Sequence, residues 1–137
     1  MVLIAYFSLA NKFIQVGKDA LSKTLRKRII KFGNYDHNIK RYIISAPLIA
    51  QLGKNFKYKE YNLISGDELL KIACDKISDI QSDLGGNIVY LECEDIPKLK
   101  QFYADNGFVE FAKRPLDRDE TDDLSGEYLL QMLKYLR

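Results

Sequence analysis

The stretch SGDELLKIACDKISDIQSDLGGNIVYLEC, residues 65–93, decides the fold of this chain. Its first two-thirds predict a helix over Ser65–Leu84, because Ser65 and Glu68 have capping-box spacing. Apolar residues then recur at helical intervals, at Leu69, Leu70, Ala73, Ile77, Ile80 and Leu84. Gly85-Gly86 ends the helix, and a strand follows at Asn87–Cys93. The apolar run Arg41–Gly53 before it is typical of a central strand buried on both faces, with Pro47 marking a bulge or an edge.

Strand, helix and strand in this order predict a parallel crossover in a mixed sheet. The rest of the chain extends this pattern. A first strand or hairpin is predicted at Val2–Leu9 running into Phe13–Val16, and a basic helix at Asp19–Phe32, ended by Gly33-Asn34. A short helix is predicted from Pro97 to Asn106-Gly107, two more strands at Phe108–Lys113 and Tyr128–Leu136, and an acidic loop at residues 114–127. We expect the last two strands to be antiparallel. The prediction is a single α/β (α+β) domain over residues 1–137.

Composition excludes several classes of protein. The chain has 137 residues, 47% of them hydrophobic and 29% charged, which is typical of a folded domain and not of a disordered one. Cys74 and Cys93 lie in apolar contexts without CxxC spacing, so we expect buried thiols of a cytoplasmic protein and no disulfide or metal site. No apolar run approaches the ~20 residues of a membrane helix, so we expect no membrane association.

The net charge of +2 conceals an asymmetry between the two halves of the chain. Residues 1–62 carry 9 lysines and 3 arginines against 3 acids, a net of +9, and residues 63–137 carry 6 lysines and 3 arginines against 16 acids, a net of −7. A basic half favours a polyanionic partner, such as a phosphate-bearing cofactor or RNA. The alternative is that lysines merely solvate short helices, and composition does not separate the two.

The junction LIAQLGKNFKYKEYNLISGDELL, residues 48–70, is the first candidate site. A buried strand leads through a polar loop into a helix N-terminus, whose free N–H groups bind anions such as phosphate. Gly66 allows close approach of a ligand, and Lys54, Lys57 and Lys59 add positive charge. In the alternative interpretation, Ser65 caps the helix and the acids of its first turn satisfy the dipole.

The second candidate site is FYADNGF, residues 102–108, with the carboxylates of the preceding strand. A phenol with a pKa of ~10 can protonate a leaving thiolate and is neutral at pH 7; alternatively, Tyr103 packs in the core. Glu92 or Glu94 can act as a general base, the alternative being solvated carboxylates at a strand end. His37, the single histidine, has no acid or nucleophile fixed beside it by sequence.

Together these segments resemble the GNAT family of acetyl-CoA-dependent N-acetyltransferases, in particular its small bacterial toxin-like members. LIAQLGKN (48–55) resembles the strand that pairs with the pantetheine arm, and the loop to ISGDELL (64–70) stands where the family has its Q/R-x-x-G-x-G/A pyrophosphate loop. IVYLECEDIPKLKQFYADNGF (88–108) resembles the following strand and helix, with their F-Y-x-x-x-G-F ending. The resemblance implies a mixed sheet with a central splayed strand pair and flanking helices.

It also implies direct transfer of acetyl from acetyl-CoA to an unidentified amine, without a metal and without an acyl-enzyme. Tyr103 would be the general acid. The family has no fixed general base, so Glu92 or Glu94 is a candidate only because of its place at the end of the strand. The implied pantetheine edge is Leu52, Gly53 and Lys54, and the implied pyrophosphate site is Tyr61, Asn62, Leu63, Ile64, Ser65 and Gly66. Asn62 and Ile64 stand where the family has glycines. Alternatives are a degenerate domain that binds CoA or a protein partner without catalysis, and toxin-like acetylation of aminoacyl-tRNA.

The chain also departs from the family at its start. In the family a strand, two helices and another strand precede the segment that VLIAYFSLANK (2–12) resembles, so we expect an N-terminally shortened domain. Either the gene product is truncated, or a partner chain or the Asp19–Phe32 helix covers the sheet. Uncovered edges and apolar faces favour association. We therefore expect a homodimer, and exchange of strands between the two copies is one way in which it can form.

Overall fold

One mixed sheet organises the described residues, which are 5–54, 65–118 and 127–136 of the computed structural model. Its strands run in the order β1-β3-β4-β6-β5, and β2 pairs with the early part of β3. The strands are β1 (Ala5–Gly17), β2 (Gly33–Asp36), β3 (Arg41–Lys54), β4 (Ile88–Cys93), β5 (Val109–Pro115) and β6 (Tyr128–Tyr135). The helices are α1 (Lys23–Ile29), followed by a 3₁₀ turn at Ile30–Phe32, α2 (Gly66–Leu84) and α3 (Pro97–Asp105).

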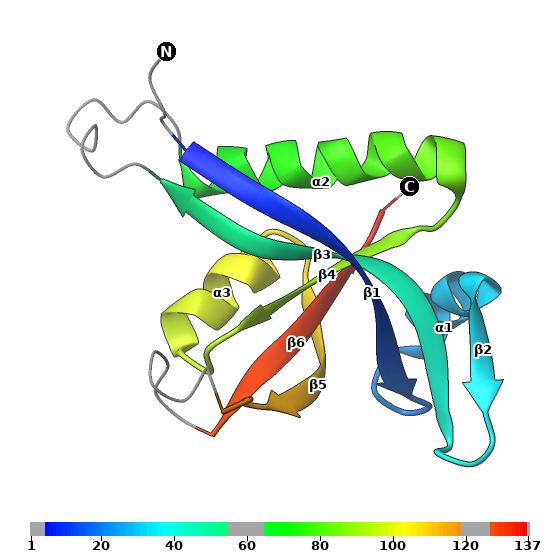
Figure 1. Cartoon of the computed structure of the whole chain (residues 1–137). Helices are drawn as coiled ribbons and strands as arrows, with labels where there is room; N and C mark the ends of the chain where they lie inside the picture. The colour runs from blue at the N-terminus through cyan, green and yellow to red at the C-terminus, as the bar shows by residue number, and fades with distance from the viewer. Residues whose placement is uncertain (1–4, 55–64, 119–126, 137) are drawn as a thin grey trace.

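The predicted parallel crossover is confirmed, because β3 and β4 pair in parallel and α2 connects them (Figure 1). The closing strands β5 and β6 are antiparallel, also as predicted. Ser65 caps α2 by accepting a 3.1 Å hydrogen bond from the N–H of Glu68, and Gly85 ends the helix at φ 86°. That positive φ favours glycine.

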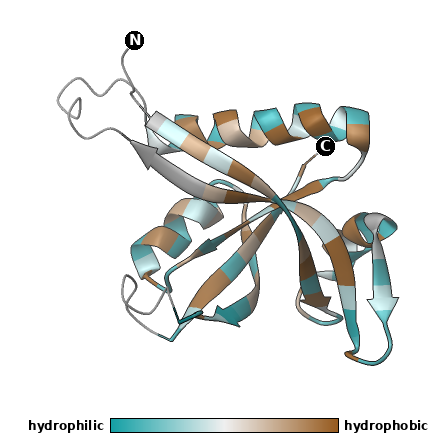
Figure 2. Cartoon of the chain, in the orientation of Figure 1, coloured by the Kyte–Doolittle hydropathy of each residue, from teal (hydrophilic) through white to brown (hydrophobic). Residues whose placement is uncertain are grey.

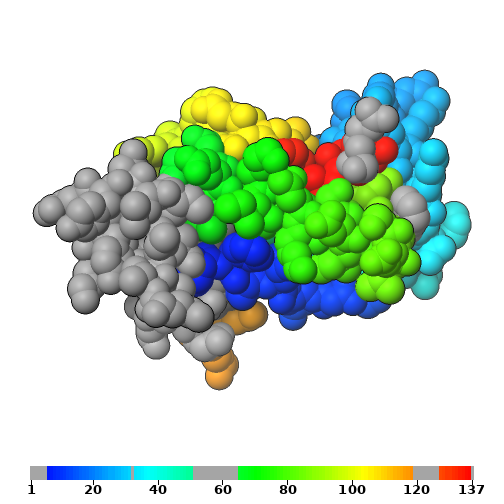
Figure 3. Space-filling model, turned by 90° about the horizontal axis from the view of Figure 1, so that it is seen from above, coloured from blue at the N-terminus to red at the C-terminus, as the bar shows by residue number. Residues whose placement is uncertain are grey.

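The sheet has an apolar core on each face. Leu70, Ala73, Cys74 and Ile77 of α2 pack on one face, with residues of α3 at the margin. On the other face the buried Ile29 of α1 joins residues of β1, β3, β4 and β5. Figure 2 shows apolar and hydrophilic residues alternating along β3 and α2. Seen from above, α2 lies between β1 and α3 (Figure 3).

The first helix is shorter than predicted. It begins at Lys23 and not at Asp19, because Ser22 accepts a hydrogen bond from the N–H of Leu25 and fixes the N-terminus there. The predicted apolar stripe still reaches the core through Leu21, Leu25 and Ile29. The Asp19–Phe32 segment therefore does cover part of one sheet face, as one of the sequence alternatives proposed.

Strand β2 was missed in the sequence. Gly33-Asn34 does end the helical segment, but residues 33–36 then pair antiparallel with Ile44–Arg41 of β3. A Cβ on Gly33 would lie 2.6 Å from Ile44 Cγ1, so the glycine permits this close pairing. Four residues without an apolar alternation carry too little signal to be recognised as a strand.

The prediction that β3 is buried on both faces is wrong. Ile44 and Ala46 are fully buried, whereas Ser45 between them is exposed. The cause is that α2 leaves part of its face of the sheet open, and Ile80 and Leu84 of the predicted apolar stripe are 38% and 83% exposed. Pro47 causes no register shift with β1. It lies between the last β2 pair, at Ile44, and the first β4 pair, at Leu48, where a missing N–H donor is tolerated.

Candidate active site

A cavity opens where β3 and β4 separate. The two strands pair only at Leu48–Tyr90 and Ile49–Leu91, although both continue beyond those residues. The cavity there measures about 400 Å³. It is lined by Leu48, Ile49, Ala50, Leu91, Glu92, Cys93, Glu94, Leu99, Tyr103 and Leu129. Tyr103 of α3 and Glu92 and Glu94 at the end of β4 therefore line one cavity.

A bulge in β3 lies at this opening. Leu9 of β1 pairs with Ile49 and Ser8 pairs with Gln51, so the register passes over Ala50. On the other side, the pairing with β4 ends at Ile49. Ala50 therefore has no ladder partner in either neighbouring strand among the described residues. A bulged residue of this kind presents an unpaired backbone group to whatever occupies the cavity.

Tyr103 reaches the cavity from α3. Its ring packs edge-on against Phe102 and Phe108, with centroids 5.1 and 6.0 Å away. Burial, followed by the charge of the Cys93 thiolate, raises the pKa of Tyr103 above its ordinary value of 10. Within the described residues its hydroxyl makes no hydrogen bond, so the proton is available to a ligand. The alternative that Tyr103 packs in the core is therefore correct for its ring, but this packing does not involve its hydroxyl.

Glu92 is firmly bound. Arg114 of β5 donates two hydrogen bonds to its carboxylate, at 2.7 and 3.1 Å, and Gln131 of β6 donates a third at 2.9 Å. Arg114 also lies 3.5 Å from Asp117. These three charge-assisted or polar hydrogen bonds hold the carboxylate in one position. The sequence offered no signal for this cluster, because its members come from three strands.

Glu94 and Cys93 line the same cavity at the end of β4. Glu94 is partly buried and follows the last residue of the strand. Burial raises the pKa of the Cys93 thiol, which contacts Met132 at 3.9 Å between the two sulfur atoms. Burial likewise raises the pKa of Cys74. Both cysteines are free and buried, so neither has the lowered pKa of a nucleophilic thiol.

The N-terminus of α2 lies beside α3. A Cβ on Gly66 would lie 3.2 Å from the Phe102 ring, so the glycine lets the two helices approach. Asn106 donates a 2.8 Å hydrogen bond to Asp67, which ties the C-terminus of α3 to the first turn of α2. The N–H groups of Gly66 and Asp67 make no hydrogen bond within the described part of the chain, which leaves them as donors for an anion.

The predicted cofactor residues are only partly described. Leu52, Gly53 and Lys54 lie in β3 and pair with Phe7, Tyr6 and Ala5 of β1. Their other edge faces the opening, since β4 pairs no further than Ile49. Tyr61, Asn62, Leu63 and Ile64 lie outside the described residues.

The remaining candidate residues fall elsewhere. His37 lies in the β2–β3 turn, stacked edge-on against Tyr35 at 4.9 Å, and does not line the cavity. No group of three or more His, Cys, Asp or Glu side chains able to hold a metal ion occurs among residues 5–54, 65–118 and 127–136. In those same residues, no helix is long and apolar enough to cross a membrane.

We compared the chain with known protein sequences and with solved structures. No family model and no curated protein sequence matches the chain. Among solved structures, a mutant of the AtaT toxin matches with a TM-score of 0.58 at 13% identity, over 96% of this chain and 58% of that one. A second bacterial toxin matches with a TM-score of 0.55 at 19% identity, over 93% of this chain and 58% of that one. The chain thus spans less than two-thirds of either neighbour. The six-stranded mixed sheet, its three helices and these neighbours confirm that the chain has the GNAT fold.

Proposed function

We propose that this single-domain protein is a cytoplasmic N-acetyltransferase that transfers acetyl from acetyl-CoA directly to an amine. The observation that carries the proposal is the cavity between β3 and β4, which both Ala50 and Tyr103 line. Among the described residues, Ala50 has no ladder partner and the Tyr103 hydroxyl makes no hydrogen bond. Acetyl-CoA supplies the activated acetyl group. The protein has to hold it, polarise its carbonyl and return a proton to its sulfur.

The residues present fit this co-substrate. The free edge of β3 at Leu52, Gly53 and Lys54 would pair with the amide groups of the pantetheine arm. The N–H groups of Gly66 and Asp67, which make no hydrogen bond within the described residues, would hold the diphosphate at the N-terminus of α2, together with the segment from Tyr61 to Ser65. Asp67 and Glu68 in the same turn oppose an anion, so binding depends on these amides and on neighbouring lysines.

The chemistry divides among three groups. The N–H of Ala50 donates to the thioester oxygen, which gains negative charge during attack. Tyr103 protonates the departing sulfur, and its raised pKa keeps that proton in place at neutral pH. Glu94 accepts the proton of the attacking amine, directly or through water. We assign the base to Glu94, which lines the cavity directly after the last residue of β4, and a structural role to Glu92, which Arg114 and Gln131 bind.

Titration calorimetry with acetyl-CoA tests the first step. We expect binding in the micromolar range, followed by release of free CoA when a panel of amines is added. The matched pair Glu94→Gln and Glu92→Gln tests the base. The Glu94 variant should lose turnover, whereas the Glu92 variant should mainly lose stability. Absence of binding would instead favour a degenerate domain that contacts a protein partner.

A second candidate is acetylation of an amine carried on RNA, such as aminoacyl-tRNA. The supporting observation is α1, which carries the exposed cations Lys23, Lys27 and Arg28 and no acid along its length. Phosphate contacts of this kind make affinity fall steeply with salt. Two results would exclude this candidate. One is tRNA binding that is the same at low and high salt, and the other is tRNA binding that is retained when these three residues are replaced by glutamine.

A further inference from the structure

Strand β1 is an edge of the sheet that no described strand pairs with from outside. It is 13 residues long and ends the strand order, so no described strand pairs with its outer side. Its sequence AYFSLANKFIQVG carries one charge, Lys12, and no proline. Natural edge strands are usually short, charged, bulged or covered, because their free N–H and C=O groups recruit another strand. The bulge in this pair lies in β3, which leaves β1 regular.

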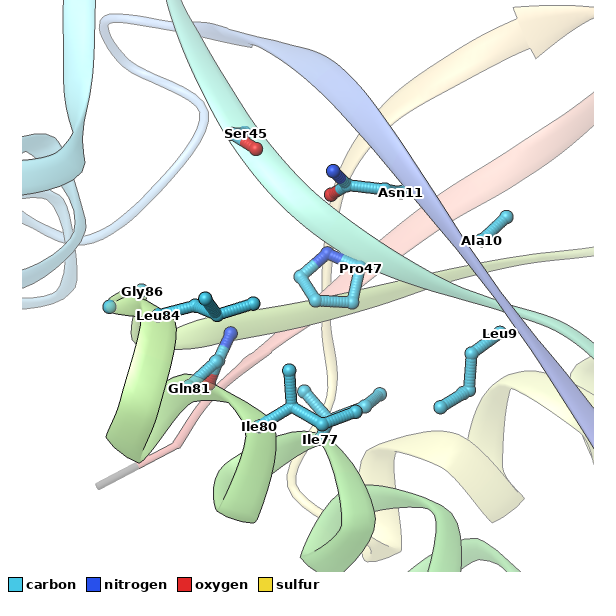
Figure 4. Close-up of a pocket in the computed structure, with 11 residues that line it drawn as sticks. Leu9, Ala10, Asn11, Ser45, Pro47, Ile77, Ile80, Gln81, Leu84 and Gly86 are labelled. Carbon is cyan, nitrogen blue, oxygen red and sulfur yellow. The ribbon is translucent and has the colours of Figure 1, made fainter.

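An apolar groove runs beside this edge, on the α2 face. It measures about 540 Å³ and lies between β1, β3 and the C-terminal half of α2. Figure 4 shows Leu9, Pro47, Ile77, Ile80 and Leu84 around it. Phe13 lies opposite Ser45, which also lines the groove, and is 76% exposed. An exposed phenylalanine next to an open apolar groove marks a contact surface.

We propose that a second copy of this chain occupies this surface, with β1 and its counterpart paired antiparallel about a two-fold axis at Asn11. Asn11 is the midpoint of Ala5–Gly17, so only this register pairs the strand over its whole length. It sets Phe13 directly opposite Leu9 of the second copy, on the α2 face, because opposite residues of antiparallel strands share a face. Each Phe13 then lies at the other copy's groove.

The size of this contact fits a stable dimer. Thirteen residues at ~3.4 Å each give a strip about 44 Å long. A strand edge of ~5 Å and the ~10 Å diameter of α2 beside it make the strip about 15 Å wide, roughly 660 Å² per copy. About 1,300 Å² in total lies in the range of specific interfaces. Lys12 faces Ala10 of the second copy, so the two lysines do not meet directly.

A cysteine cross-link tests the register. Asn11→Cys should oxidise to a covalent dimer, because opposite Cα atoms lie ~4.5–5.5 Å apart, within the disulfide range. Lys12→Cys is the matched control, since two such residues lie ~7–8 Å apart diagonally and should not cross-link. The buried Cys74 and Cys93 give no background in the folded protein. Cross-linking of the Lys12 variant alone, or of neither, would overturn the register.

Light scattering tests the contact itself. The 137-residue chain should elute at twice its mass, and Phe13→Asp should weaken the dimer roughly 100-fold or more, because two phenylalanines leave apolar contacts. Phe13→Leu should remain dimeric. Since Phe13 is 76% exposed, both variants should keep the wild-type circular dichroism spectrum. A wild-type chain that is monomeric at every concentration would refute the proposal and leave the edge to a different partner. The outcome is independent of acetyl-CoA binding.

Discussion

Replacing Tyr103 by phenylalanine separates catalysis from folding in this protein. The variant keeps the ring and its contacts with Phe102 and Phe108, and it removes a hydroxyl that makes no hydrogen bond within the described residues. The free energy of unfolding should therefore change by less than about 0.5 kcal/mol. Loss of a general acid lowers turnover by ~10²–10⁴-fold, which raises the barrier by about 2.7–5.4 kcal/mol.

The assay follows free CoA with a thiol reagent while a reactive amine is supplied with acetyl-CoA. Calorimetry should give the same acetyl-CoA affinity for the wild type and the variant, because the hydroxyl acts on the departing sulfur. Tyr42→Phe is the matched control: it removes a phenol that packs against Tyr35 on the other sheet face and does not line the cavity. Its turnover should equal that of the wild type.

The pH profile adds a second readout. Because burial raises the pKa of Tyr103 above 10, its proton is retained and turnover should show no alkaline loss below about pH 10. Wild-type turnover in Tyr103→Phe would refute the role of the hydroxyl. Parallel loss of affinity, turnover and stability would show that the residue acts through packing instead.

Three further predictions concern stability, measured by urea unfolding. Gly33→Ala should lower the free energy of unfolding by about 1–3 kcal/mol, because its Cβ would lie 2.6 Å from Ile44 Cγ1. Gly17→Ala is the control and should be tolerated, because the nearest atom to its Cβ is 3.9 Å away. Equal effects of the two substitutions would contradict this explanation. Arg114→Met should cost about 1.5–3 kcal/mol by leaving Glu92 without its bidentate partner, and adding Glu92→Gln should recover part of that loss, which a double-mutant cycle measures. Burial and the charge of Glu92 raise the pKa of Tyr90 from 10 to about 12, so its neutral form is favoured in the folded state. The resulting stability is present below pH 10 and is lost as the pH rises through about 12, at most about 2 kcal/mol, and Tyr90→Phe should abolish that part of the alkaline loss.

The helices and the crossover were predictable because their signals are local. A capping serine, a glycine stop and apolar residues at helical spacing act within one turn or one element, so α2, β4 and the proline at the start of α3 were located from the chain alone. Element boundaries were less certain, as Ser22 shows: a cap three residues inside the predicted helix set its start.

Local patterns also located the ends of β3 and β4, and so identified the side chains there as candidates for a site. Their roles depend on contacts between distant segments. The partners of Glu92 come from β5 and β6, and the bulge at Ala50 arises from the register of β1 against β3. No single segment encodes such pairings, so the sequence could not distinguish Glu92 from Glu94.

Apart from the short strand β2, the sequence by itself determined the order of strands and helices, the parallel crossover, the buried thiols and the placement of a tyrosine next to a helix end, because each follows from short-range periodicity and capping. Tertiary structure alone decided where the strands separate, which carboxylate is bound by arginine and which apolar residues stay exposed. Phe13, Ile80 and Leu84 belong to apolar patterns that predict burial, yet 76%, 38% and 83% of their respective surfaces are exposed. The reason is that burial requires a partner surface, and α2 and β1 leave a groove between them that the described residues do not fill.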